Sequence, residues 1–262
     1  MRILFAGDVV GKPARQFLRE LLPALRTKEE LDVIIVNGEN GAAGSSLTKE
    51  SAKDIFSAGV DIVTSGDHIF KRKEVREVLE TMDVLRPLNW GGNAFGRGYL
   101  IKTVGDYKIG VINLVGRVFM QPSDCPFNAV IAAVEEIKKE TNIIIVDVHA
   151  EATSEKVAMG YFLSGKVSLV AGTHTHIPTA DERIINDTAY ITDVGMTGSC
   201  DSILGRDKAA IIEKFVTNLP VKFNVVDGDV RLQGVIVDID ETTGKALNIK
   251  RVEYRQGQDH GK

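Results

Sequence analysis

Most of the chain alternates short apolar runs with amphipathic segments. Uncharged, β-branched runs predict buried parallel strands, and apolar positions recurring every three or four residues predict helices. Strands are expected at Ile3–Ala6, Val33–Val36, Ile62–Val63, Ile143–Val148, Val167–Ala171 and Tyr190–Thr192. Helices are expected at Ala14–Leu25, Thr48–Ser57, Arg72–Glu80, Ala129–Lys139, Ser154–Phe162 and Lys208–Val216.

The first three helices carry local signals. Pro13 suits the first turn of the first helix, whereas Pro23 is expected to kink or restart it. Thr48 is expected to cap the second helix. The third, Arg72–Glu80, is mostly charged, which predicts a surface position.

Two regions interrupt the alternation. Residues 87–120 contain seven glycines and two strand-like pieces, Tyr99–Val104 and Lys108–Leu114, which predict a hairpin with a loop-rich entry. Near the C-terminus, Lys222–Val226 and Val230–Asp238 flank Asp227-Gly228, a strong two-residue hairpin signal.

A second turn, at Thr243-Gly244, leads to a strand at Leu247–Glu253 and completes an antiparallel meander. The pattern as a whole predicts an α/β fold in which two packed sheets are flanked by helices. We expect a single domain over residues 1–262, with a frayed tail at 256–262.

Composition and charge limit the classes of protein to which the chain could belong. The chain has 262 residues, 44% of them apolar and 26% charged, which is ordinary for a soluble globular protein. A net charge of −4 gives no support for nucleic-acid or membrane binding. There is no signal-peptide pattern and no long apolar run, and Cys125 and Cys200 lie far apart, so a cytoplasmic protein without disulfides is expected. A homo-oligomer is compatible with these features.

Acidic and histidine side chains, which can bind metal ions, come directly after the expected strands. The carboxyl ends of parallel strands converge at one edge of a sheet, so these segments should lie together. The segments are Gly7-Asp8, Asn37-Gly38-Glu39-Asn40, Gly66-Asp67-His68, His149 and Gly172-Thr173-His174-Thr175-His176.

Each segment alone has a simpler interpretation. Asp8 could cap the following helix, Glu39-Asn40 could be turn residues, and His149 could be a hydrogen-bonded structural residue. His174 and His176 are harder to explain this way, because period-two spacing on extended backbone would point both rings to the same side.

The occurrence of all these segments in one chain favours a metal-binding site. Crowded buried carboxylates raise one another's pKa values, and divalent cations would neutralise them. Oxygen and nitrogen ligands without thiolate fit Fe, Mn, Zn or Co.

The motif order resembles that of calcineurin-like metallophosphoesterases. The version with Glu39-Asn40, and without a histidine two residues after Asp8, resembles the YmdB-like family of bacterial phosphodiesterases. The likeness continues through residues 116–120, 126–127 and 192–198 and covers nearly the whole chain. It implies a four-layer αββα sandwich with a two-metal centre, often di-iron, that hydrolyses 2′,3′-cyclic nucleotides and related phosphodiesters.

The resemblance also implies roles for individual residues. The first metal would be held by Asp8, Glu39, Asn40 and His176. Glu39 would bridge to a second metal, completed by Asp67, His149 and His174. The family normally has Asn in place of Asp67, and the added charge should tighten metal binding and reduce Lewis acidity.

His68 would face the substrate as a general acid that protonates the leaving ribose oxygen, while the metals activate the attacking water. Its alternative role is to orient Asp67 or that water.

Two further residues are candidates for substrate contacts. Arg117 could hold a phosphate oxygen and Trp90 could stack on a base, although a surface ion pair and a core residue are the simpler interpretations. Phosphodiester hydrolysis of a small substrate such as a cyclic nucleotide is the leading prediction. A phosphomonoesterase or nucleotidase with the same centre remains open, as does a metal- and nucleotide-binding regulatory protein with vestigial catalysis.

Overall fold

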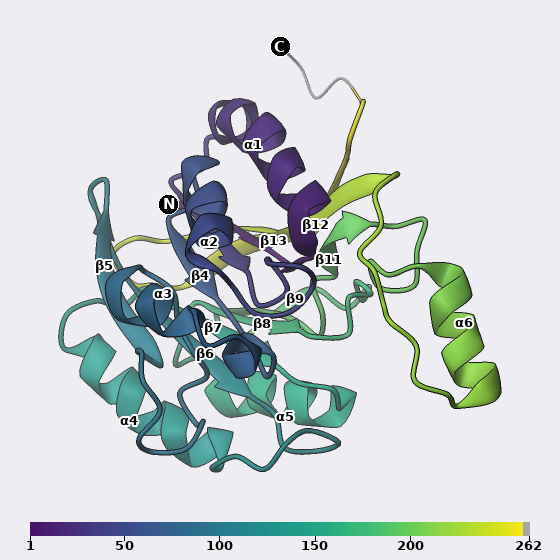
Figure 1. Cartoon of the computed structure of the whole chain (residues 1–262). Helices are drawn as coiled ribbons and strands as arrows, with labels where there is room; N and C mark the ends of the chain where they lie inside the picture. Colours follow the sequence, from purple (N-terminus) through teal and green to yellow (C-terminus); the bar gives the residue numbers. More distant parts are fainter. Residues whose placement is uncertain (259–262) are drawn as a thin grey trace.

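The computed structural model describes residues 1–258, in which two sheets lie face to face between layers of helices (Figure 1). The first sheet has the strand order β2-β11-β12-β1-β3-β4, and β13 pairs with β12. Its strands are β1 (Arg2–Ala6), β2 (Asp8–Val9), β3 (Val33–Asn37), β4 (Ile62–Thr64), β11 (Met196–Ser199), β12 (Val230–Ile239) and β13 (Ala246–Arg255).

The second sheet has the strand order β5-β6-β7-β8-β10-β9. Its four middle strands are parallel, and the two edge strands pair antiparallel to their neighbours. The strands are β5 (Tyr99–Val104), β6 (Tyr107–Val115), β7 (Ile144–His149), β8 (Leu169–Thr173), β9 (Arg183–Ile185) and β10 (Thr188–Ile191). The predicted hairpin of residues 99–114 is therefore confirmed as the β5–β6 edge of this sheet.

Helices cover the outer faces of both sheets, which confirms the four-layer αββα sandwich (Figure 1). The first sheet is covered by α1 (Gly11–Lys28), α2 (Lys49–Ser57) and α3 (Val75–Thr81), and the second by α4 (Pro126–Lys138) and α5 (Thr153–Leu163). A short 3₁₀ turn, Ile69–Lys71, precedes α3. The last helix, α6 (Lys208–Thr217), stands apart from both sheets.

Strand alternation explains why the strands read as unbroken apolar runs. In β1, Ile3 and Phe5 pack between the two sheets, whereas Leu4 and Ala6 belong to the cluster beneath α1. Successive side chains point to opposite faces of a sheet, and both faces are covered here. A polar residue inside such a strand therefore stands out.

The helices differ from the sequence expectation in two places. Thr48 caps α2 as predicted, because its Oγ1 accepts a hydrogen bond from Ser51 N at 3.2 Å. In contrast, α1 continues through Pro23 without a restart; Pro23 lies on the exposed side, where the carbonyl that it leaves unpaired can bind water. The third helix begins only at Val75. It lies on the surface as predicted, with Arg76, Glu77 and Glu80 exposed, while Val75 and Val78 on its other face are buried.

The predicted hairpin at Asp227-Gly228 is wrong. Residues 222–226 form no strand, and Val225 makes only an isolated bridge to Arg206. The following strand, β12, pairs instead with β1, β11 and β13. The turn at Thr243-Gly244 does join β12 to β13 as predicted.

Of the predicted tail at 256–262, only residues 256–258 are described, and Gln256 N donates to Val230 O at 2.9 Å. Within residues 1–258, no helix is long and apolar enough to cross a membrane.

Candidate metal centre

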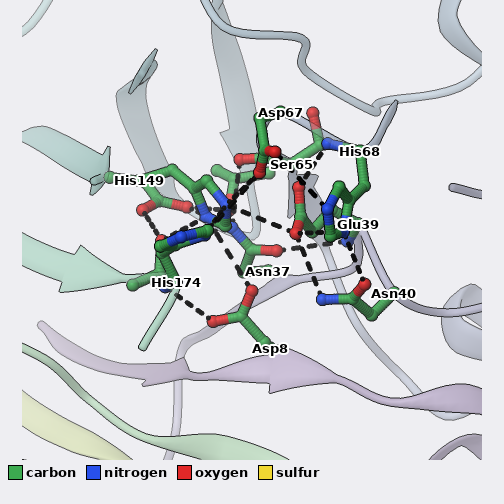
Figure 2. Close-up of polar contacts among 12 residues, drawn as sticks. Asp8, Asn37, Glu39, Asn40, Ser65, Asp67, His68, His149 and His174 are labelled. Carbon is green, nitrogen blue, oxygen red and sulfur yellow. Dashed lines mark hydrogen bonds and ion pairs between the residues drawn. The ribbon is translucent and has the colours of Figure 1, made fainter. Parts of the chain in front are cut away.

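Eight acidic, amide and imidazole side chains meet where strands of the two sheets end, and Figure 2 labels all of them except His176. Sequence reasoning expected this convergence from the strand-end positions. Asp8 begins β2, Glu39 and Asn40 follow β3, Asp67 and His68 follow β4, His149 ends β7, and His174 and His176 follow β8. We refer to these residues as the eight-residue cluster. The two sheets contribute different members, so only their packing brings the cluster together.

One part of the cluster surrounds the Nε2 atom of His149. This nitrogen lies 3.3 Å from Glu39 Oε1, 3.2 Å from Asp67 Oδ1 and 3.0 Å from His174 Nδ1. One donor atom of each of these four residues lies within 4.8 Å of the others, a spacing that could hold a metal ion. We call these four residues the His149 group.

A second part comprises Asp8, Asn40 and His176, which we call the His176 group. Asp8 also contacts the His149 group, since Oδ1 lies 3.8 Å from His149 Nδ1 and Oδ2 accepts a hydrogen bond from His174 N at 3.1 Å. Asn40 Nδ2 lies 3.1 Å from Glu39 Oε1 and 3.3 Å from His176 Nε2. Asp8 Oδ1 lies 3.8 Å from His176 Nε2.

Two buried atoms of the His176 group, Asp8 Oδ1 and His176 Nδ1, have no hydrogen-bond partner among the described residues. A buried carboxylate oxygen without a partner is costly, and a cation would satisfy it. The donors of both groups are oxygen and nitrogen only, so they fit a centre of two transition-metal ions.

Burial and crowding determine the charges of the cluster. Burial raises the pKa of Asp8 to about 7, and Glu39 adds to this rise. Burial also opposes ionisation of Glu39, but His149 and His68 hold the pKa of Glu39 below its ordinary value. Burial alone would lower the pKa of His149, yet Glu39 and Asp67 raise it well above the ordinary value. The positive charge of protonated His149 thus balances the negative charges of Glu39 and Asp67. A bound cation would take the place of that proton.

His68 lies at the rim of the cluster, with 29% of its side chain exposed. Its Nε2 lies 3.4 Å from Asp67 Oδ2, and its Nδ1 lies 3.2 Å from Asn40 Oδ1. Burial lowers the pKa of His68, against the opposing charges of Glu39 and Asp67. A nearby phosphate would act in the opposite direction and raise the pKa of His68.

The backbone argument for His174 and His176 is wrong in its premise. Strand β8 ends at Thr173, and the two histidines have φ values of 97° and 64°, so the segment is not extended. Both rings still face the cluster, but they contact different partners: His174 lies against His149, and His176 lies against Asn40.

A buried ion pair holds this turn in place. Asp193 accepts hydrogen bonds from Thr175 N at 3.1 Å and Thr175 Oγ1 at 2.7 Å. Lys156, also buried, donates to Asp193 Oδ2 at 2.8 Å and to Thr173 O at 3.0 Å. These bonds offset the strain of two non-glycine residues at positive φ. Asp193 lies within the 192–198 stretch of the family likeness, but neither it nor Lys156 was expected to have a role from the sequence.

Beneath the cluster lies a buried polar set that sequence analysis also missed, which we call the buried quartet: Asn37, Thr64, Asp147 and Thr173. Asp147 Oδ1 accepts a hydrogen bond from Thr173 Oγ1 at 2.7 Å, and Oδ2 accepts from Thr64 Oγ1 at 2.5 Å and Asn37 Nδ2 at 2.9 Å. The available signal was an Asp two residues before His149, on the same face of an otherwise apolar strand.

Two more missed residues border the His149 group. Glu151 Oε2 lies 3.0 Å from His174 Nε2, on the side of the ring opposite His149. Gly66 leaves space for the donors, because a Cβ atom there would lie 2.2 Å from His149 Nε2 and 2.4 Å from Glu39 Oε2.

Arg117 and Trp90 lie outside the cluster. Arg117 is exposed, two residues after Val115, which pairs with His149 in the sheet. Trp90 is half-buried, with its ring centroid 5.4 Å from that of Phe70. Within residues 1–258, no hydrogen bond, ion pair or ring contact joins either side chain to the eight-residue cluster.

A four-layer αββα sandwich with acids and histidines gathered at its strand ends defines a metallophosphoesterase-type protein. The family model described as "YmdB-like protein" matches residues 4–252. The chain therefore belongs to the YmdB-like family.

The relatives agree with this assignment. The chain is 45% identical over 254 residues to the 2′,3′-cyclic-nucleotide 2′-phosphodiesterase of Bacillus subtilis, covering 96% of each protein. A hypothetical protein from Thermus thermophilus has a similar crystal structure, with a TM-score of 0.92, 38% identity and coverage of 97% of this chain and 99% of that one. A novel phosphatase from Mycoplasma pneumoniae has a TM-score of 0.91, 33% identity and coverage of 97% and 93%.

Proposed function

We propose that this protein is a two-metal phosphodiester hydrolase that acts on 2′,3′-cyclic nucleotides and related small phosphodiesters. The observation that carries the proposal is the position of the Glu39 carboxylate between the two donor groups. Its Oε1 lies 3.3 Å from His149 Nε2 and 3.1 Å from Asn40 Nδ2. The substrate class is taken from the activity named for the Bacillus subtilis relative.

The His149 group would hold one metal, and the His176 group with Glu39 would hold the other. Bound there, the two cations would neutralise phosphate charge and activate water. Asn40 would have to turn its amide, because Nδ2 rather than Oδ1 now faces Glu39 and His176.

Three residues would contact the substrate. His68 would hold a proton for the leaving ribose oxygen, a role supported by its being the most exposed histidine of the cluster. Arg117 would bind a phosphate oxygen and Trp90 would stack on the base; the exposed position of Arg117 at the strand edge beside His149 supports the first role.

Iron is the proposed native metal, with manganese, zinc and cobalt as alternatives for the same donors. We also propose a cytoplasmic location, and a homo-oligomer remains compatible with the fold. A phosphomonoesterase and a regulatory protein with vestigial catalysis are the competing functions.

The decisive experiment compares three substrates on protein loaded with Mn²⁺ or Fe²⁺: 2′,3′-cyclic AMP, bis-p-nitrophenyl phosphate and p-nitrophenyl phosphate. We expect turnover of the two diesters to exceed that of the monoester, and elemental analysis to find about two metals per chain. Preference for the monoester would indicate a phosphatase. Two bound metals without any turnover would indicate the regulatory alternative.

A further inference from the structure

The two ring nitrogens of His149 have different surroundings. Nε2 faces Glu39 and Asp67, whereas Nδ1 lies 2.9 Å from Thr173 Oγ1. A neutral imidazole carries its proton on one nitrogen, and the hydrogen bond made by that nitrogen selects the tautomer. The partner of Nδ1 therefore decides whether Nε2 can present a lone pair to a bound cation.

The hydroxyl proton of Thr173 already has an acceptor. Thr173 Oγ1 donates to Asp147 Oδ1 at 2.7 Å, and Asp147 Oδ2 accepts from Thr64 and Asn37 in the same way. The Thr173 oxygen is then left to accept from His149 Nδ1–H. Two other polar groups lie near Nδ1. The Asn37 amide nitrogen, at 3.5 Å, donates and so cannot take that role, and Asp8 Oδ1, at 3.8 Å, lies beyond hydrogen-bond distance.

Hydrogen bonds from three neighbouring strands favour the ionised form of Asp147. Asn37 at the end of β3, Thr64 at the end of β4 and Thr173 at the end of β8 all donate to it. Burial raises the pKa of Asp147 to about 7, and the charge of His149 and these three donors act against that rise. Four strands thus fix one acceptor directly under His149.

We propose that Asp147 and Thr173 form a relay that places the proton of His149 on Nδ1 and so reserves Nε2 for metal. Both are positioning residues, since neither belongs to the eight-residue cluster. The inference rests on the proposed metal centre and deepens it. A cation at Nε2 requires this tautomer, so relay and metal stabilise each other, as carboxylates behind metal-bound histidines do elsewhere.

Zinc titration of four proteins tests the relay. Thr173→Val removes the hydroxyl but keeps the shape, and we expect zinc affinity at the affected site to fall about 10–100-fold. Thr173→Ser restores the hydroxyl and should bind like wild type. Thr64→Val is the matched control, because it also removes one hydrogen bond to Asp147 but does not touch His149. Thermal melts of the metal-free variants check that each one folds.

Nitrogen NMR of ¹⁵N-histidine-labelled, Zn²⁺-loaded wild type gives an answer without any variant. We expect His149 to carry an exchange-protected proton on Nδ1. A proton on Nε2 would overturn the proposal, as would equal losses of zinc affinity in Thr173→Val and Thr64→Val. Wild type that binds no zinc, manganese or iron would contradict the metal centre itself. If Thr173→Val does not fold, Asp147→Asn replaces it and should weaken zinc binding to the same extent.

Discussion

The two donor groups on either side of Glu39 differ in how the protein satisfies their polar atoms. In the His149 group, His149 contacts Glu39 and Asp67 on one side and Thr173 on the other, and Glu151 lies against His174. In the His176 group, Asp8 Oδ1 and His176 Nδ1 have no hydrogen-bond partner among the described residues. Both groups have protein contacts, but the His176 group also holds a buried carboxylate oxygen, Asp8 Oδ1, that a cation would satisfy. The comparison predicts that the two sites fill with different affinities.

The largest effect is expected from changing Glu39, because both donor groups share this residue. Glu39→Gln removes the charge that serves both groups, so we expect activity and both metals to be lost. The effect should exceed the roughly 10–100-fold cost of altering a supporting residue. Elemental analysis and diester turnover measure it. Normal metal content and rate in Glu39→Gln would disprove the bridging role.

A matched pair of variants, His149→Ala and His176→Ala, should sharpen the difference. Each should lose about one of two metals. Only His149→Ala should also destabilise the metal-free protein, by about 3–5 kcal/mol, because it removes the buried positive charge beside Glu39 and Asp67. Denaturant melts with chelator present check this. Equal destabilisation by both changes would show that the two groups are alike.

His68 belongs to neither group in our proposal, so its removal should leave metal content unchanged. His68→Ala should slow hydrolysis of 2′,3′-cyclic AMP by about 10²–10⁴-fold, the usual contribution of a positioned acid. Hydrolysis of bis-p-nitrophenyl phosphate should suffer far less, because p-nitrophenolate leaves without a proton. Equal losses on both substrates would instead indicate that His68 orients Asp67 or the attacking water.

The smallest effect is expected at Asp67. Asp67→Asn gives the residue usual in the family, keeps an oxygen donor and removes one negative charge from the His149 group. Metal affinity should fall, while the rate of the fully loaded enzyme should stay level or rise. Metal titration followed by turnover at saturation separates the two. Loss of activity at full loading would mean that the carboxylate has a second task.

Strand-end positions predicted the cluster because backbone direction alone carries Asp8, Glu39, Asp67 and His149 to one edge. The layered fold followed from the same apolar runs. The failed hairpin at Asp227-Gly228 shows the limit of local signals, since the partners of β12 lie far away in sequence. Strands β2 and β11, of two and four residues, are too short to show any period.

The roles of the eight residues stay predictions, whereas their gathering is a property of the fold. The buried quartet could not be identified from the sequence with the same ease. Asn37, Thr64 and Thr173 read individually as ordinary strand-end polar residues, and only Asp147 interrupts an apolar run. Their common partner emerges when β3 and β4 of the first sheet pack against β7 and β8 of the second, an arrangement that a single sequence does not specify.

Gly66 has a consequence for how such proteins are recognised. Its lack of a side chain leaves the volume in which Glu39 and His149 approach each other. A chain with Ala at this position would retain every acid and every histidine, and a motif search that counts donors would accept it. Its donors would nevertheless be forced apart by one methyl group. The signature of this centre therefore includes an empty volume, and an inactive paralogue could be identified by that methyl group alone.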